Sequence, residues 1–210
     1  MDNELRGQMP NPLLTNKFSE IYSTGGKLWK GVESASGRGS DTATTARVRE
    51  MLPRIVHGLG VNTLLDAGCG DWNWMRQIDL GNVEYHGVDI VPGIIDANRQ
   101  KYPHHDWGVA DITSDTLFKA DLILCRSVLF HLSLDNVHKA VANLKSTGSP
   151  WLLTTTYPLH AKDWDEIKDG GFHPVNFERS PFNWPKPYLL IPETNELEGW
   201  LGLFKLSEIS

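Results

Sequence analysis

The sequence predicts an α/β fold: a doubly wound, mostly parallel seven-stranded sheet with helices on both faces and a terminal antiparallel hairpin. From residue 61 onward, short apolar runs alternate with helical patterns. These runs are continuously apolar, which is typical of parallel strands buried on both faces. The last two apolar runs are separated by only nine residues. That distance is too short for a parallel crossover, so the last pair should be antiparallel.

Each expected element has its own signal. The strands of the parallel part are expected at 62–67, 84–90, 106–110, 120–125 and 151–156, and those of the hairpin at 188–191 and 201–206. Helices are expected over 72–78, after Pro92, which suits a first helical position, and after Ser133, which is a good cap. Another helix should begin near Ser40 or Asp41, with Pro53 kinking it or ending its first part.

The length of 210 residues, at 23.6 kDa, indicates one domain with a modest extension. We expect residues 1–42 to form an N-terminal arm with a Gly/Ser-rich cover loop. Residues 43–210 would form the domain, with an aromatic and Pro-rich insertion at about 157–187. Because a long structureless segment inside a compact domain is usually functional, this insertion is expected near a site.

Composition excludes several classes of protein. The net charge is −6 and no Lys/Arg cluster is present, which argues against an extended nucleic-acid track. No apolar run reaches the length of a membrane span, and the first residues lack the apolar core of a signal peptide. Cys69 and Cys125 lie in apolar runs and are expected to be reduced, which favours the cytoplasm. His104 and His105 point to opposite faces of a strand, so no metal site is expected.

The most informative segment is LLDAGCGDWNW, which begins at Leu64. A glycine turn after a buried first strand brings backbone N–H groups against a ligand. However, Asp66 and Asp71 place carboxylates where the pyrophosphate of a dinucleotide would lie, and Asn73 stands at the third glycine position. Like charge is unfavourable there. A cofactor with a cationic end, such as S-adenosylmethionine, is favoured, and a nicotinamide oxidoreductase is disfavoured.

With these residues the chain resembles the class I (Rossmann-like) S-adenosylmethionine-dependent methyltransferases, over about residues 43–157 and the final hairpin. The resemblance implies that Asp89 binds the ribose, that Asp111 contacts the adenine, and that ADLILCRSVLFHLS approaches the methyl donor. The residues expected to bind the cofactor are Asp66, Gly68, Gly70, Trp72, Asp89, Ile90, Asp111, Ile112, Cys125 and Arg47.

The catalytic and acceptor residues are less constrained. His131 is a candidate general base, although it could instead pack a helix start, and Glu33 is the alternative base. Tyr157 is a candidate for the acceptor wall. Arg126 could hold an anionic acceptor or pair with a nearby Asp. Trp29 lies in the expected cover loop.

The segment FNWPKP over 182–187 contains Trp184 and Lys186. It would form either a lid over the acceptor or simply the entry to the hairpin. An Arg126/Lys186 pair facing the methyl group would indicate an anionic acceptor. An aromatic box would indicate a flat or cationic one.

The expected function is methyl transfer to an oxygen or nitrogen of a small or medium-sized acceptor, such as a sugar, a nucleotide-linked intermediate or a natural-product precursor. The segment CRSVLF replaces the (N/D)-P-P-(Y/F) motif often found in amino-methyltransferases of nucleic acids, which argues against DNA base amines. A tRNA or protein methyltransferase and a noncatalytic cofactor-binding partner subunit stay open. A monomer or a homodimer is expected.

Overall fold

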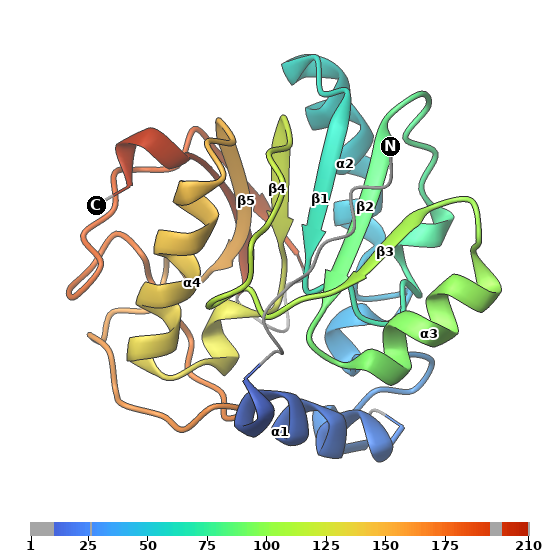
Figure 1. Ribbon diagram of the computed structural model, residues 1–210. Helices are drawn as coiled ribbons and strands as arrows, with labels where there is room; N and C mark the ends of the chain where they lie inside the picture. The colour runs from blue at the N-terminus through green and yellow to red at the C-terminus, as the bar shows by residue number, and fades with distance from the viewer. Residues whose placement is uncertain (1–10, 26, 194–198, 210) are drawn as a thin grey trace.

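The computed structural model describes residues 11–25, 27–193 and 199–209. One seven-stranded sheet forms its centre, with the strand order β3-β2-β1-β4-β5-β7-β6 (Figure 1). The strands are β1 (Thr63–Ala67), β2 (Glu84–Asp89), β3 (Asp106–Val109), β4 (Leu122–Cys125), β5 (Trp151–Thr156), β6 (Leu189–Pro192) and β7 (Trp200–Lys205).

The directions of the strands confirm the predicted sheet. The first five strands pair in parallel, whereas β7 is antiparallel to both β5 and β6. Thr156 at the end of β5 and Pro192 at the end of β6 both pair with Trp200 at the start of β7. The carboxyl ends of β1 to β6 and the start of β7 therefore meet at one edge.

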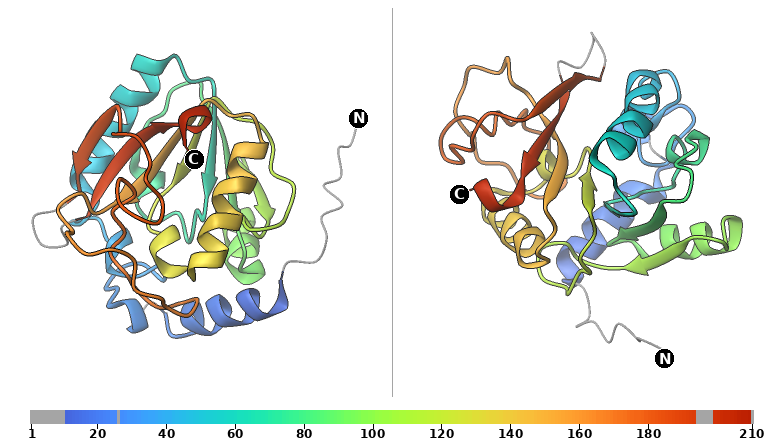
Figure 2. Two further views of the ribbon diagram at one scale, coloured as in Figure 1. Left: turned by 90° about the vertical axis from the view of Figure 1, so that its left-hand side faces the viewer. Right: turned by 90° about the horizontal axis from the view of Figure 1, so that it is seen from above.

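Helices cover both faces of the sheet. α2 (Ala46–Leu59) and α3 (Pro92–Lys101) pack on one face, and α4 (Leu134–Ser146) packs on the other (Figure 2). α1 (Pro12–Ser23) lies across the edge where the parallel strands end (Figure 1). The N-terminal arm is thus partly helical, with Asn11 accepting a capping hydrogen bond from the backbone N–H of Leu13.

Two of the expected helix positions are wrong. α2 begins at Ala46, because the segment Arg38–Ser40 forms a separate short turn and the Asp41 carboxylate accepts backbone N–H groups of residues 32–34. Pro53 lies inside α2 without ending it. The helix expected over 72–78 is only the turn Met75–Gln77. Trp72 has a φ of 59°, and a left-handed residue cannot continue an α-helix.

The insertion over 157–187 contains no helix or strand, and its aromatic residues are part of the core. Trp184 stacks on Phe177 with 4.1 Å between ring centroids, and both contribute to the cluster on the α4 face of the sheet. The segment is therefore anchored by its own rings.

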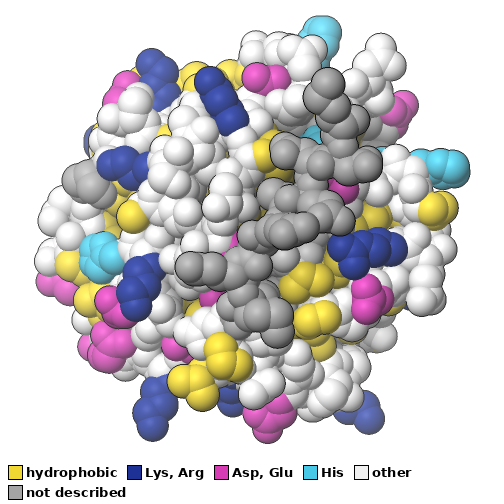
Figure 3. All heavy atoms as spheres, in the orientation of Figure 1, with side chains coloured by type: hydrophobic (Ala, Val, Ile, Leu, Met, Phe, Trp, Pro, Cys, Tyr) yellow, Lys and Arg dark blue, Asp and Glu magenta, His cyan; other side chains and the backbone are white. Residues whose placement is uncertain are grey.

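Charges of both signs are mixed on the face that Figure 3 shows. Figure 3 shows Lys and Arg side chains interspersed with Asp and Glu over the face it presents. Among the helices of the described ranges, none has the length and apolar character needed to cross a bilayer. In the same part of the chain, no three His, Cys, Asp or Glu side chains gather as metal ligands would.

Candidate functional site

A cavity of about 490 Å³ opens at the edge where the parallel strands end. This is the position at which open α/β sheets bind ligands, and the volume is that of a small-molecule site. Its lining comes from the ends of β1 to β6, from α1, and from the loops that follow α1.

The glycine turn after β1 forms the floor of the cavity. Gly68 and Gly70 have φ values of 90° and 57°, a backbone region that favours glycine. A Cβ at Gly68 would collide with Val128, and one at Gly70 would collide with Ser36. The backbone N–H groups of Gly68 and Cys69 donate to the Val88 carbonyl and fix the turn against β2.

Two buried carboxylates flank this turn. The Asp89 carboxylate accepts hydrogen bonds from the backbone N–H groups of Gly70 and Val91, both at 3.0 Å. Asp66 accepts the Tyr85 hydroxyl at 2.7 Å. Burial raises the pKa of Asp66 to about 7 and that of Asp89 to about 6. A cationic ligand would favour the ionised forms of both carboxylates and be stabilised by them, whereas an anionic diphosphate would be repelled by the ionised forms.

Asp111 has an unused acceptor at the end of β3. One of its oxygens accepts the N–H and hydroxyl of Thr113, whereas the buried Oδ2 has no partner among the described residues. Asp111 lines the cavity together with Ile90 and Ile112. Two apolar side chains in the same lining as one unsatisfied carboxylate oxygen fit a purine ring with an exocyclic amino group. The residues present therefore fit S-adenosylmethionine.

Beyond β4 the lining becomes aromatic. The Phe130 ring lies 5.3 Å from the Phe172 ring and 5.7 Å from the Tyr157 ring, edge to face in both pairs. Trp29, from the N-terminal arm, stacks on His131 with ring centroids 4.9 Å apart. All five side chains line the cavity, so this part of the wall resembles the aromatic box.

His131 is held neutral. Its Nδ1 lies at hydrogen-bond distance from the Gly171 carbonyl oxygen, so this nitrogen donates and Nε2 carries the free lone pair. Burial lowers the pKa of His131 to about 4. The imidazole is therefore unprotonated near neutral pH, and its Nε2 can accept a proton or a hydrogen bond.

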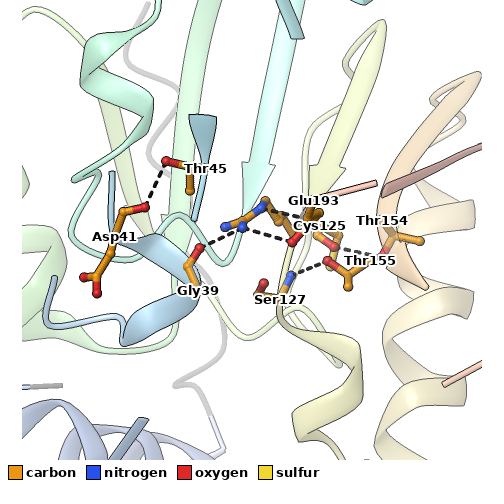
Figure 4. Close-up of polar contacts among 9 residues, drawn as sticks. Gly39, Asp41, Thr45, Cys125, Ser127, Thr154, Thr155 and Glu193 are labelled. Carbon is orange, nitrogen blue, oxygen red and sulfur yellow. Dashed lines mark hydrogen bonds and ion pairs between the residues drawn. The ribbon is translucent and has the colours of Figure 1, made fainter. Parts of the chain in front are cut away.

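Arg126 forms a buried ion pair. Its Nε and Nη2 each donate to one oxygen of Glu193, both at 3.0 Å, and Nη2 also donates to the Gly39 carbonyl at 2.7 Å. Figure 4 shows Glu193 beside Gly39 of the N-terminal loop and Ser127 at the end of β4. The sequence allows a nearby Asp as one possible partner of Arg126. The structure gives it a carboxylate partner, but this partner is Glu193, which follows β6.

The N-terminal arm is fastened onto the glycine turn. The Asp71 carboxylate accepts the hydroxyls of Ser34 and Ser36 and the backbone N–H of Ala35. The Tyr22 hydroxyl is hydrogen-bonded to the Ser36 hydroxyl at 3.2 Å. Tyr22 and Ser36 both line the cavity, so the arm forms part of its wall.

Several predicted site residues lie outside this cavity. Glu33 bonds to Thr42 on the surface, and Arg47 pairs with Glu50 on an exposed face of α2. The others are placed elsewhere: Trp72 packs among Tyr85, Tyr102 and Trp107, Cys125 is in the core, Trp184 is buried on Phe177, and Lys186 is exposed.

The remaining predicted residues line one cavity, together with others that sequence reasoning did not select. The predicted residues are Asp66, Gly68, Gly70, Asp89, Ile90, Asp111, Ile112, Arg126, His131, Tyr157 and Trp29. The residues missed include Tyr22, Ser36, Phe130, Phe172 and Glu193. The spacing of Tyr22 with Phe18 indicates a helix face, but no sequence signal ties Glu193 to Arg126.

Comparison with known proteins gives a consistent result. Residues 65–150 match the family model described as a methyltransferase domain. The chain is 29% identical over 144 residues to malonyl-[acyl-carrier protein] O-methyltransferase of Serratia marcescens, a match that covers 66% of this chain. The chain spans only 56% of that relative's length.

Two solved structures share the fold. Magnesium protoporphyrin IX methyltransferase from Synechocystis PCC 6803, with bound SAH, superposes with a TM-score of 0.55 at 15% identity, covering 71% of this chain and 73% of the other. The N-methyltransferase NodS from Bradyrhizobium japonicum WM9, in complex with S-adenosyl-L-homocysteine (SAH), gives 0.52 at 20% identity, covering 65% and 74%.

Proposed function

We propose that the chain is a class I S-adenosylmethionine-dependent methyltransferase that transfers a methyl group to an oxygen or nitrogen of a small or medium-sized acceptor. One observation carries the proposal: a single cavity joins an acidic part and an aromatic part. Asp66, Asp89 and Asp111 stand at the ends of β1, β2 and β3. The aromatic part begins after β4, where Phe130 and His131 lie.

The sheet order explains this division. In the order β3-β2-β1-β4-β5-β7-β6, strand β4 separates the three acidic strand ends from those of β5, β7 and β6. The cofactor would therefore lie over β1 to β3 with its methyl group directed toward the end of β4. The acceptor would lie over the ends of β5 and β6 and the start of β7, next to Tyr157.

The bound cofactor would supply an already activated methyl group, so the protein must mainly align the two reactants and exclude water. Asp66 and Asp89 would hold the cofactor through charge and hydrogen bonding, and Asp111 would accept a hydrogen bond from its base. Trp29 shields His131 from solvent. His131 Nε2 would take the proton that an acceptor hydroxyl or amine loses as its lone pair bonds to the methyl carbon and the carbon–sulfur bond breaks, which leaves SAH.

We further propose that residues 1–42 act as the cover of this site, of which the described part already contributes Trp29 to the wall. Both cysteines are free and buried. They suit a reducing compartment, and we place the protein in the cytoplasm.

The proposal is tested in two steps. Isothermal calorimetry with SAH should show one site per chain. Incubation with S-adenosylmethionine carrying a labelled methyl group, together with a small-molecule cell extract, should then label at least one product that mass spectrometry identifies as methylated. Binding of SAH without any labelled product would favour the noncatalytic partner subunit. Absence of SAH binding would refute the proposed function.

A further inference from the structure

A buried ion pair stands in the acceptor part of the cavity wall. Arg126 follows β4, and Glu193 follows β6. Their side chains are only 3% and 5% exposed, and both residues line the cavity. Arg126 also packs over the Trp74 ring, with its guanidinium carbon 5.0 Å from the ring centroid. Glu193 is thus held rigidly at the acceptor side of the methyl-transfer position.

Stability alone does not explain this pair. The cost of taking two charges out of water often cancels their attraction, and apolar residues of similar volume are frequently as stable. The cavity that the pair lines is otherwise partly aromatic, with Phe130, Tyr157 and Phe172 in the same lining. A charged pair retained in such a wall points to a ligand that it recognises.

Glu193 has spare capacity to accept hydrogen bonds. Each of its oxygens accepts one hydrogen bond from Arg126, and a carboxylate oxygen can accept two. Arg126 has fewer donors to spare. Two of its nitrogens donate to Glu193, and one of these also donates to the Gly39 carbonyl. The atoms of the pair that are free to bind a ligand are therefore the oxygens of Glu193, which accept hydrogen bonds. A ligand that binds them must present a donor such as O–H or N–H.

We propose that Glu193, fixed by Arg126, accepts a hydrogen bond from a hydroxyl or amino group of the methyl acceptor, and that this acceptor is an uncharged or cationic ring compound. The proposal rests on the methyl-transfer function proposed above. The ring lies against the aromatic wall, and Glu193 sets its orientation toward the methyl group.

The charges around the wall agree with this acceptor. The Arg126 charge is neutralised by Glu193, and His131 is neutral, so the buried wall carries no net cation. Lys30 and Arg38 line the cavity only as exposed residues. Lys186, expected to help hold an anion, does not line it. An anionic acceptor would therefore lose its hydration without a buried cation to replace it.

The test compares variants with a panel of acceptors. Methyl glycosides, amino sugars and phenols represent uncharged or cationic rings, and sugar phosphates and benzoates represent anions. Methyl transfer from labelled S-adenosylmethionine is measured for each compound, with SAH affinity measured in parallel by calorimetry. We expect transfer to members of the first group only.

Glu193→Gln should raise the KM of the best acceptor by about 10- to 100-fold, the range expected for a lost charged hydrogen bond, while the Kd of SAH stays within about twofold. Because Glu193→Gln leaves Arg126 without its counter-charge, the double variant Arg126→Met/Glu193→Leu provides the decisive comparison. It removes the pair without leaving a lone buried charge. Glu208→Gln, an exposed carboxylate bonded to Tyr188 in the same part of the chain, is the matched control.

The outcomes separate the two proposals. If the double variant binds SAH normally and its acceptor KM stays raised, Glu193 recognises the acceptor. If the double variant recovers the wild-type KM, the pair is structural and the inference is overturned. Transfer to the anionic compounds alone, or to no compound while SAH binds, also overturns the inference. If the wild-type protein does not bind SAH, the proposed function itself is overturned.

Discussion

Replacing Asp89 by Asn gives the sharpest test of the cofactor half of the site. The Asp89 carboxylate is 6% exposed and is held by two backbone N–H groups at 3.0 Å. A hydrogen bond to a charged group contributes about 1.5–3 kcal/mol, so losing the charge should weaken SAH binding by about 10- to 100-fold at pH 8.

The pKa of Asp89 also predicts how the affinity for SAH depends on pH. Burial raises this pKa to about 6, and a ligand hydrogen-bonded to the carboxylate favours the ionised form. Wild-type affinity should therefore be complete well above pH 6, about halved at pH 6, and fall further as the pH drops below it. At pH 5 only about one tenth of Asp89 is ionised, so the gap between wild type and Asp89→Asn should shrink about tenfold. Asp66 titrates too, with a pKa of about 7 that the charge of Asp89 helps to raise, so the ratio of the two affinities reports Asp89 together with its coupling to Asp66.

The assay is calorimetric titration with SAH at several pH values from about 5 to 8. Asp121→Asn is the matched control, because Asp121 also accepts two backbone N–H groups, those of Asn62 and Thr63, but lies outside the cavity. A ratio of affinities that does not change with pH would refute the assignment of the titrating group to Asp89. A ratio near one at pH 8 would refute its contact with the cofactor.

Two further changes probe catalysis and the N-terminal arm. His131→Gln should lower kcat by about 100-fold or more without changing the Kd of SAH. Because the pKa of His131 is about 4, titration of His131 should not lower the wild-type kcat between about pH 8 and 6. An unchanged kcat in the variant would exclude His131 as the base. Asp71→Ala removes the acceptor for Ser34, Ala35 and Ser36, so trypsin should cleave after Lys30 roughly tenfold faster, corresponding to ~1.4 kcal/mol of lost hydrogen bonding. Equal cleavage rates would mean that these bonds do not hold the arm.

The sequence predicts the sheet well because each strand carries a local signal. Continuous apolar runs identify the strands, and the nine-residue separation identifies the antiparallel pair. The acidic residues at the ends of β1 to β3 also follow from the sequence, since consecutive strands bring their carboxyl ends to the same edge. The acidic part of the site can therefore be predicted from short segments of the sequence.

The parts that the sequence does not predict depend on contacts between distant segments. The helix expected over 72–78 fails because Trp72 adopts a left-handed conformation, which its residue type does not announce. Asp71, expected beside the cofactor, instead accepts hydrogen bonds from the arm some 35 residues earlier. Trp184 lies in a segment whose composition allows a lid over the acceptor, yet Trp184 stacks on Phe177 and is buried in the core.

The same contrast distinguishes the two halves of the cavity. The cofactor half uses side chains that immediately follow their strands in the N-terminal part of the sheet, so motif and geometry coincide. The acceptor half combines Trp29 of the arm, Arg126 after β4 and Glu193 after β6. Arg126 and Glu193 are 67 residues apart and meet only because β7 inserts between β5 and β6 and brings the end of β6 to the same edge. Since these residues lie outside the glycine turn and the three acids, an acceptor-binding set can change without altering the cofactor motif. The identity of the acceptor must therefore be sought in contacts such as Arg126–Glu193, and not in the glycine turn and the three acids.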